Sequence, residues 1–233
     1  MKNKKDASQN STVFWKMAKD YVDHRLPEIR KVSPNTVKAY RDSLNKYIDY
    51  LEAEKNIRRT DISFSDFNKS NIIDYLDWML NVRKYAYKTC NLRITAIHAL
   101  LEYAANENST DLMSIYLDAH SVKGLKVTAN PVEYFEEHQM KALLAAPNEK
   151  TRTGRRNQMM LILYYDTAAR ISELLDMKLS QLHLDAHIPY LTILGKGRKY
   201  RNIPLMDKTM RHLKSYLYIF HKDDLFSIPF IKS

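Results

Sequence analysis

The sequence predicts a mainly α-helical protein with one small β-hairpin, organised as two domains. Only four of the 233 residues are glycine and seven are proline, so few positions interrupt a helix. Apolar residues recur every three or four positions through most of the chain, which is the spacing of one helix face. Only residues 190–205 change to a strand-like pattern, with glycines between its two halves. With a hydrophobic fraction of 45%, a chain of this length is enough for one large domain or two small ones.

The N-terminal end combines a polar leader with a first helix. Residues 1–11 are rich in Lys, Asn, Ser and Asp, and we expect them to form a disordered leader. Helical spacing starts at Phe14 and continues through Met17 and Tyr21. Pro27 is expected to end this helix, because proline has no N–H to donate to the helix ladder.

Further helices complete a predicted bundle over residues 12–120. Ser33 and Pro34 form a helix start, with a capping serine followed by proline at the first helical position. Each helix carries one apolar stripe. The stripes predict helices over 34–51, 70–79, 87–105 and 112–117. Together they predict a compact helical bundle.

A linker and a second domain follow the bundle. Residues 121–131 lack periodicity and contain Gly124, Pro131 and two lysines, so we expect a linker there. The second domain is expected over 132–233. Its helices are predicted over 136–146, 157–167, 171–177 and 207–220, and its β-hairpin over 190–205.

The composition favours a nucleic-acid partner. The chain carries 37 Lys and Arg against 27 Asp and Glu, a net charge of +10, which suits a polyanion, although a merely soluble basic protein has the same balance. The four glycines are not arranged as a dinucleotide-binding turn or a Walker A loop. Cys90 is the only cysteine, which excludes an intrachain disulfide and a cysteine-rich zinc site. Because no segment resembles a membrane span or a secretory signal, we expect a cytoplasmic protein.

The junction between two helices of the second domain carries the first chemical signal. An apolar helix ends near Thr167, and Arg170 follows at the start of the next helix, three residues before Glu173. At this spacing the carboxylate can hold the guanidinium in place. A fixed guanidinium is a planar fork of donors suited to a phosphate. The alternative is an ordinary ion pair on a helix surface.

The tip of the predicted hairpin carries the second signal. It reads Gly195-Lys-Gly-Arg-Lys-Tyr-Arg201, and its glycines free the loop to bend around a ligand backbone while its cations suit phosphates. The alternative is a solvated hairpin tip whose charges protect a sheet edge.

These two motifs together resemble the tyrosine recombinase and phage integrase family of site-specific DNA recombinases. The matching residues are Thr167, Arg170, Ile171, Ser172, Glu173 and Leu174, then Gly195, Lys196, Gly197, Lys199, Arg201, Ile203, Pro204 and Leu205. More loosely, Ser33-Pro-x-Thr-x-x-x-Tyr40 and Lys88-Thr-x-Asn-x-Arg93 resemble helices of the family's core-binding domain. The resemblance implies a SAM-like helical core-binding bundle over 12–120 and the N-terminal part of an α+β catalytic domain over 132–233.

The resemblance also implies a reaction and a set of catalytic residues. In this family a tyrosine attacks a DNA phosphate, which forms a 3′-phosphotyrosyl link and releases a 5′-hydroxyl without a metal or other cofactor. By this resemblance Arg170 is the first catalytic arginine and Glu173 orients it. Lys196 is the hairpin lysine that protonates the leaving 5′-oxygen. Cations in such a site stabilise charge on the non-bridging oxygens.

Double-stranded DNA is the partner that we expect. The predicted contact residues are basic or polar positions of two bundle helices, the linker and the hairpin: Lys38, Arg41, Lys88, Thr89, Asn91, Arg93, Lys123, Lys126, Arg198, Lys199 and Arg201. Such side chains mostly position the phosphate backbone. A solvated helix face is an equally weighted alternative for the bundle residues.

The chain departs from the family pattern in two ways. Ala168 stands where the family commonly has glycine. The family's His-x-x-Arg box and nucleophilic tyrosine follow the hairpin and its next helix, and the sequence has no His-x-x-Arg before it ends at Ser233. Tyr216 and Tyr218 are interpreted as packing residues of that helix. We therefore expect the polypeptide alone to bind DNA without cleaving it.

Three hypotheses about function remain. The chain is part of an active recombinase, or a catalytically dead DNA-binding remnant, or a helical DNA-binding regulator. The Arg170, Glu173 and Lys196 constellation argues against the regulator. The complete family members act as tetramers on DNA, whereas this chain alone is expected to be a monomer that contacts no membrane.

Overall fold

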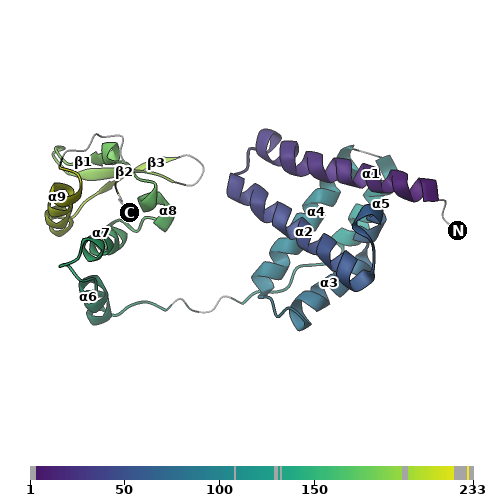
Figure 1. Cartoon of the computed structure of the whole chain (residues 1–233), viewed down its shortest axis with the longest axis horizontal. Coiled ribbons are helices and arrows are strands. Elements are labelled where there is room, and N and C mark those ends of the chain that lie inside the picture. The colour runs from purple at the N-terminus through teal and green to yellow at the C-terminus, as the bar shows by residue number, and fades with distance from the viewer. Residues whose placement is uncertain are drawn as a thin grey trace. The chain divides into compact units, whose positions relative to one another are not determined.

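The computed structural model describes residues 4–107, 109–128, 131, 133–195, 199–222 and 230. The chain divides into two compact units, residues 1–130 and residues 131–233 (Figure 1). The prediction of a mainly helical protein with a small antiparallel sheet is confirmed. None of the helices in the described ranges is long and apolar enough to cross a membrane.

The first unit is a helical bundle. Its helices are α1 (Lys4–Asp20), the π-helix η1 (Tyr21–Ile29), α2 (Pro34–Lys55), α3 (Lys69–Asn81), α4 (Tyr87–Glu107) and α5 (Ser109–His120), with 3-10 turns η2 (Arg59–Asp61) and η3 (Phe64–Phe67). The predicted start of α2 is confirmed, because the Ser33 hydroxyl accepts the N–H of Thr36 at 3.2 Å and Pro34 occupies the first turn.

The expected disordered leader is wrong from Lys4 onward, because α1 begins there. Ser11 is 3% exposed, and its hydroxyl donates to the carbonyl of Thr60 at 2.6 Å. Phe14, one turn further on, is fully buried against the ring of Phe67, with centroids 5.1 Å apart. These contacts keep a polar stretch in the helix that its composition alone does not predict.

Pro27 does not end the first helical segment as expected. It lies inside η1, whose turns are wider than those of an α-helix. At the end of this segment the N–H of Arg30 reaches the carbonyl of Arg25, at 2.9 Å. The chain stays helical through the proline because Tyr21 and Leu26 are buried in the core of the unit.

Aromatic side chains form much of the first core. Tyr47 is fully buried, with its ring centroid 4.8 Å from Phe67 and 5.0 Å from Tyr75. Its hydroxyl donates to the carbonyl of Asp66 at 2.9 Å. Each such ring pair adds about 0.5–1.5 kcal/mol beyond the area it buries. This core fixes α2 against α3, and so orients the N-terminal turns that carry the predicted DNA contacts.

The second unit combines helices with a three-stranded antiparallel sheet in the order β1-β2-β3. Its elements are α6 (Glu137–Ala145), α7 (Arg152–Thr167), α8 (Ile171–Leu175), η4 (Leu179–Gln181), β1 (Leu182–His183), β2 (Tyr190–Leu194), β3 (Tyr200–Pro204) and α9 (Asp207–Phe220). The predicted hairpin is confirmed as β2 and β3, and β3 lies at the sheet edge. The short strand β1 was not predicted.

The sheet places alternate residues toward the core of the second unit. Leu191 and Ile193 of β2 are buried, and they pair with Ile203 and Arg201 of β3. Directly paired residues share one face of an antiparallel sheet. Arg201 therefore lies on the inner face of the sheet, the face that carries these buried residues.

Candidate active site

A sharp turn between α7 and α8 positions Arg170. Ala168 adopts a left-handed conformation, with φ 47° and ψ 29°, and its N–H donates to the carbonyl of Tyr164 at 3.0 Å. The hydroxyl of Thr167 donates to the carbonyl of Leu163 at 2.6 Å and accepts the N–H of Ala169 at 3.3 Å. The turn leaves Arg170 as the first residue before α8, with its side chain 61% exposed.

Glu173 holds Arg170 by its main chain and its side chain. The Arg170 guanidinium donates from Nη1 to Oε1 of Glu173, and the Arg170 N–H donates to Oε2, both at 2.8 Å. The Glu173 side chain is only 6% exposed, so this is not a solvated surface pair. The predicted pairing is therefore present, and the guanidinium keeps further donors open to solvent.

A second arginine reaches the same carboxylate. Nη2 of Arg201 donates to Oε2 of Glu173 at 2.8 Å. Sequence reasoning assigned Arg201 to DNA and missed this contact. The strand alternation that puts Arg201 on the same face as Ile203 was the signal that could have revealed it.

The arginines decide the charge state of Glu173. Burial alone raises the pKa of this carboxyl. The hydrogen bonds from the main chain and side chain of Arg170, together with the positive charges of Arg201 and Arg170, outweigh burial and hold the pKa below its usual value. Glu173 is therefore an anion at neutral pH.

The loop between β2 and β3 lies close to Glu173 and Arg201 at its first residue, Gly195. The N–H of Gly195 donates to the carbonyl of Lys199 at 2.8 Å and closes the loop. A side-chain carbon added at Gly195 would lie 3.6 Å from Oε1 of Glu173 and from a guanidinium nitrogen of Arg201. Lys199 is exposed. Lys196 and Arg198 lie outside the described residues, so their predicted roles stay predictions.

The predicted contacts on α2 are exposed. Lys38 is exposed on the first turns of the helix. Arg41 is 54% exposed and donates to Asp23 at 2.8 Å. A surface pair of this kind contributes about 0–1 kcal/mol, so Arg41 can leave it for a phosphate.

Some of the predicted contacts on α4 are exposed, and others already contact neighbouring residues of the protein. Lys88 is exposed and Thr89 is half-buried. Asn91 bonds the backbone of Leu125 through both ends of its amide. Arg93 lies with its guanidinium carbon 4.1 Å from the ring centroid of Tyr85, where the ring's electron density favours a cation. Asn91 and Arg93 therefore have structural partners already.

The linker lysines are both exposed. Lys123 and Lys126 flank Leu125, the residue that Asn91 holds. No group of three or more His, Cys, Asp or Glu side chains in the described ranges could hold a metal ion.

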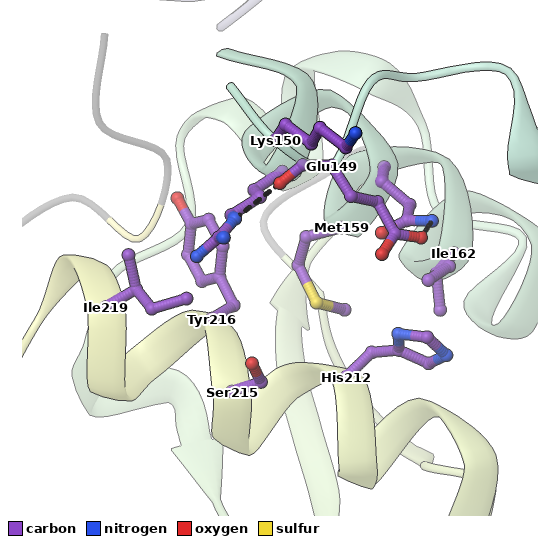
Figure 2. A pocket seen from close by; sticks show the side chains of 10 residues that line it. Glu149, Lys150, Met159, Ile162, His212, Ser215, Tyr216 and Ile219 are labelled. Atoms are coloured by element: carbon purple, nitrogen blue, oxygen red, sulfur yellow. Dashed lines mark hydrogen bonds between the residues drawn. The ribbon is translucent and has the colours of Figure 1, made fainter. Parts of the chain in front are cut away.

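A pocket between α7 and α9 contains none of the predicted site residues. Figure 2 shows Met159 and Ile162 of α7 facing His212 and Tyr216 of α9, with Glu149 above them. The lining is mixed, with the basic residues Lys150 and Arg155 beside Glu149 and the apolar residues. It shares no residue with the cluster of Arg170, Glu173 and Arg201.

The two tyrosines of α9 have different surroundings. Tyr216 is 3% exposed, stacks on Phe220 with ring centroids 4.5 Å apart, and donates to the carbonyl of Phe230 at 3.2 Å. Its interpretation as a packing residue is confirmed. Tyr218 is 69% exposed, so the same interpretation is wrong for Tyr218.

Sequence comparison identifies both units. The "Phage integrase, N-terminal SAM-like domain" pattern matches residues 19–108, and the "Phage integrase family" pattern matches residues 133–225. A putative integrase/recombinase, y4rC, from Sinorhizobium fredii is 30% identical over 196 residues, which are 83% of this chain and 58% of the relative. A tyrosine recombinase XerD from Staphylococcus saprophyticus is 30% identical over 186 residues, 80% of this chain and 59% of the relative. The chain thus spans about three fifths of these relatives.

Solved structures share the fold. The Tn1549 transposon integrase in complex with circular intermediate DNA aligns with 95% of this chain and 69% of its own length, at a TM-score of 0.59 and 16% identity. The XerH site-specific recombinase bound to a palindromic difH substrate aligns with 81% of this chain and 54% of its own, at a TM-score of 0.59 and 17% identity. The N-terminal and the catalytic patterns of the phage integrase family match in order and together cover most of the chain, and the two relatives are named as an integrase/recombinase and as a tyrosine recombinase. The chain therefore belongs to the phage integrase family of tyrosine recombinases.

Proposed function

We propose that this chain binds duplex DNA and presents Arg170 to a backbone phosphate, as part of a site-specific recombinase. One observation carries the proposal. Glu173 fixes the Arg170 guanidinium through one nitrogen, while the Arg170 side chain stays 61% exposed. A planar fork of donors that is held in place yet open to solvent suits the non-bridging oxygens of a phosphodiester.

The reaction proposed for the complete protein is strand exchange through a phosphotyrosyl link. A tyrosine hydroxyl attacks the phosphorus and gives up its proton to solvent water, and the bond to the 5′-oxygen breaks. Arg170 stabilises the charge on the non-bridging oxygens. Lys196, assigned from the sequence alone, gives a proton to the leaving 5′-oxygen. The scheme uses no metal or nucleotide, and we propose that four complete copies act together on DNA.

The proposed phosphate contacts differ in whether their side chains are free or already have a protein partner. The first group consists of lysines with exposed side chains, which are free to reach a phosphate: Lys38, Lys88, Lys123, Lys126 and Lys199. Arg41 joins them after leaving Asp23, and Thr89 and Arg198 remain proposals from the sequence. Asn91, Arg93 and Arg201 have protein partners, so we propose that the first two act on DNA only indirectly, by shaping α4 and the linker.

A binding experiment tests the role of Arg170. Anisotropy of a labelled duplex is measured over a salt series for the wild type, Arg170→Met and Arg58→Met. Arg58 is a matched control because it is 81% exposed and pairs with Asp61 on the surface. Arg170→Met is expected to weaken binding about tenfold and to lower the salt slope by about one. Equal effects of the two variants would sink the proposal.

A second experiment addresses cleavage. The 233 residues include no His-x-x-Arg, so we propose that this polypeptide alone binds DNA without forming a covalent adduct. A suicide duplex, which traps the phosphotyrosyl link, is incubated with the protein and examined on a denaturing gel. A covalent band that disappears on protease treatment contradicts the proposal and identifies a nucleophile within these residues.

A further inference from the structure

The second arginine on Glu173 has a consequence for how the first one binds. A carboxylate has about four acceptor positions, two on each oxygen. On Oε2 of Glu173, the N–H of Arg170 and Nη2 of Arg201 take both positions, each at 2.8 Å. On Oε1, Nη1 of Arg170 takes one position, also at 2.8 Å. The oxygen facing Arg201 is therefore saturated.

Saturation of Oε2 limits the Arg170 side chain to a single bond. An arginine beside a free carboxylate usually closes a two-pronged pair, with two parallel N–H bonds to the two oxygens. Arg170 does not, and among the described residues its Nε and Nη2 make no hydrogen bond. These donors are the ones that a phosphate would use.

The strand pairing explains why Arg201 is available for this contact. Arg201 pairs with Ile193 across the β2–β3 ladder, and Ile193 is 1% exposed in the core. Residues paired in this way project from the same face. Arg201 therefore enters from the inner face of the sheet, where Glu173 lies, and its side chain is 40% exposed.

We propose that Arg201 is a positioning residue that keeps Arg170 open for phosphate. By occupying Oε2 it prevents Arg170 and Glu173 from closing into a two-pronged pair, and it joins β3 to the start of α8. The loop that carries Lys196 begins at Gly195, whose added side-chain carbon would lie 3.6 Å from both Glu173 and Arg201. Arg201 thus links the two cationic elements through one carboxylate. This inference rests on the proposed role of Arg170 at a phosphate.

The test is a double-mutant cycle on duplex binding by the whole chain. Arg201→Met removes the charge and every donor while keeping an unbranched side chain, and it is expected to weaken binding about tenfold. If Arg201 acts through Arg170, adding Arg201→Met to Arg170→Met causes no further loss. Full additivity of the two losses overturns the proposal and makes Arg201 a direct phosphate contact.

Lys199 provides the matched control, because it lies two residues away on the same hairpin and is exposed. Lys199→Met removes one charge without touching Glu173. Its effect is expected to add fully to that of Arg170→Met. Non-additivity of Lys199→Met equal to that of Arg201→Met would show a general charge effect and overturn the proposal.

Two further measurements separate positioning from folding and from DNA binding. Arg201→Lys restores a donor for Oε2, so its affinity is expected to lie closer to the wild type than that of Arg201→Met. In the free protein, the Nε–Hε resonance of Arg170, assigned by its loss in Arg170→Lys, should shift in Arg201→Met and not in Lys199→Met. An unmoved resonance overturns the proposal. If the wild type binds no duplex, the proposed function fails, and this resonance alone decides the role of Arg201.

Discussion

Asn91 and Leu125 pair through both ends of one side-chain amide. The Asn91 nitrogen donates to the carbonyl of Leu125 at 2.9 Å, and the Asn91 oxygen accepts the Leu125 N–H at 2.7 Å. The Asn91 side chain thus satisfies both backbone hydrogen-bonding groups of Leu125, in the segment that follows α5. The expected linker over 121–131 is therefore fixed to α4 as far as Leu125. Gly124 fits this contact, since a side-chain carbon there would lie 3.1 Å from the Asn91 oxygen.

The first prediction tests this tether. Asn91→Ala removes both hydrogen bonds, each worth about 0.5–1.5 kcal/mol, and should abolish protection of the Leu125 amide from hydrogen exchange. Asn91→Asp keeps the acceptor for the Leu125 N–H and loses only the donor. The Leu125 amide should therefore stay protected in Asn91→Asp. Equal exchange in the two variants would show that the tether does not depend on this acceptor.

The second prediction concerns the start of α1. Ser11→Ala leaves the carbonyl of Thr60 without its partner inside the unit and should lower the free energy of unfolding by about 1 kcal/mol. Both tryptophans, Trp15 and Trp78, belong to the first unit, so their fluorescence in a urea titration reports that unit. Gln9→Ala, at an exposed position of the same helix, is the comparison. An unchanged midpoint for Ser11→Ala would contradict a stabilising role for this hydrogen bond.

The third prediction concerns Ala168. Its φ of 47° is costly for alanine and free for glycine. Ala168→Gly should stabilise the second unit by about 0.5–1 kcal/mol, after the greater freedom of glycine in the unfolded chain is subtracted. The buried methyl resonances of Leu191 and Ile193, followed through urea, report this unit. Ala169→Gly, at the next position, should be destabilising, and stabilisation by both would contradict the backbone argument.

The fourth prediction is a pH dependence of Glu173. Its pKa is lower in the folded protein than in the unfolded chain, so the ionised carboxylate stabilises the fold above the ordinary glutamate value of 4.5. That contribution is lost as the pH falls through the folded-state pKa. The difference in unfolding free energy between the wild type and Glu173→Gln should therefore be constant from pH 7 to pH 5 and shrink below ~4.5. A difference that grows on acidification would contradict this sign.

Local signals in the sequence predicted the parts of the fold that depend on neighbouring residues. The start of α2 follows from Ser33 and Pro34, because a cap and a proline act within one turn. The β2–β3 hairpin follows from alternation on either side of Gly195. Contacts between distant residues were not predictable in this way. The hydroxyl of Ser11 donates to a carbonyl 49 residues away. The polar residues around Ser11 in the sequence indicated disorder instead of this contact.

In the candidate site, too, the contact between neighbouring residues was predictable from the sequence and the contacts between distant residues were not. The Arg170–Glu173 pair spans three residues and was readable from helix spacing. Arg201 reaches Glu173 from 28 residues away, so only the packing of the sheet on α8 reveals that contact. Asn91 and Arg93 matched a DNA-binding motif by residue type. Their contacts with Leu125 and Tyr85 depend on the linker path and on the turn before α4.

The shared carboxylate also sets the charge balance of the site. Two guanidinium groups meet one carboxylate, so the cluster of Arg170, Arg201 and Glu173 has an excess of one positive charge. A phosphodiester within a strand carries one negative charge and would neutralise that excess. A terminal phosphate monoester, with about −1.5 to −2 charges at neutral pH, would overshoot it. Before Lys196 is counted, the cluster is therefore matched in charge to a phosphate inside a DNA strand rather than to one at its end.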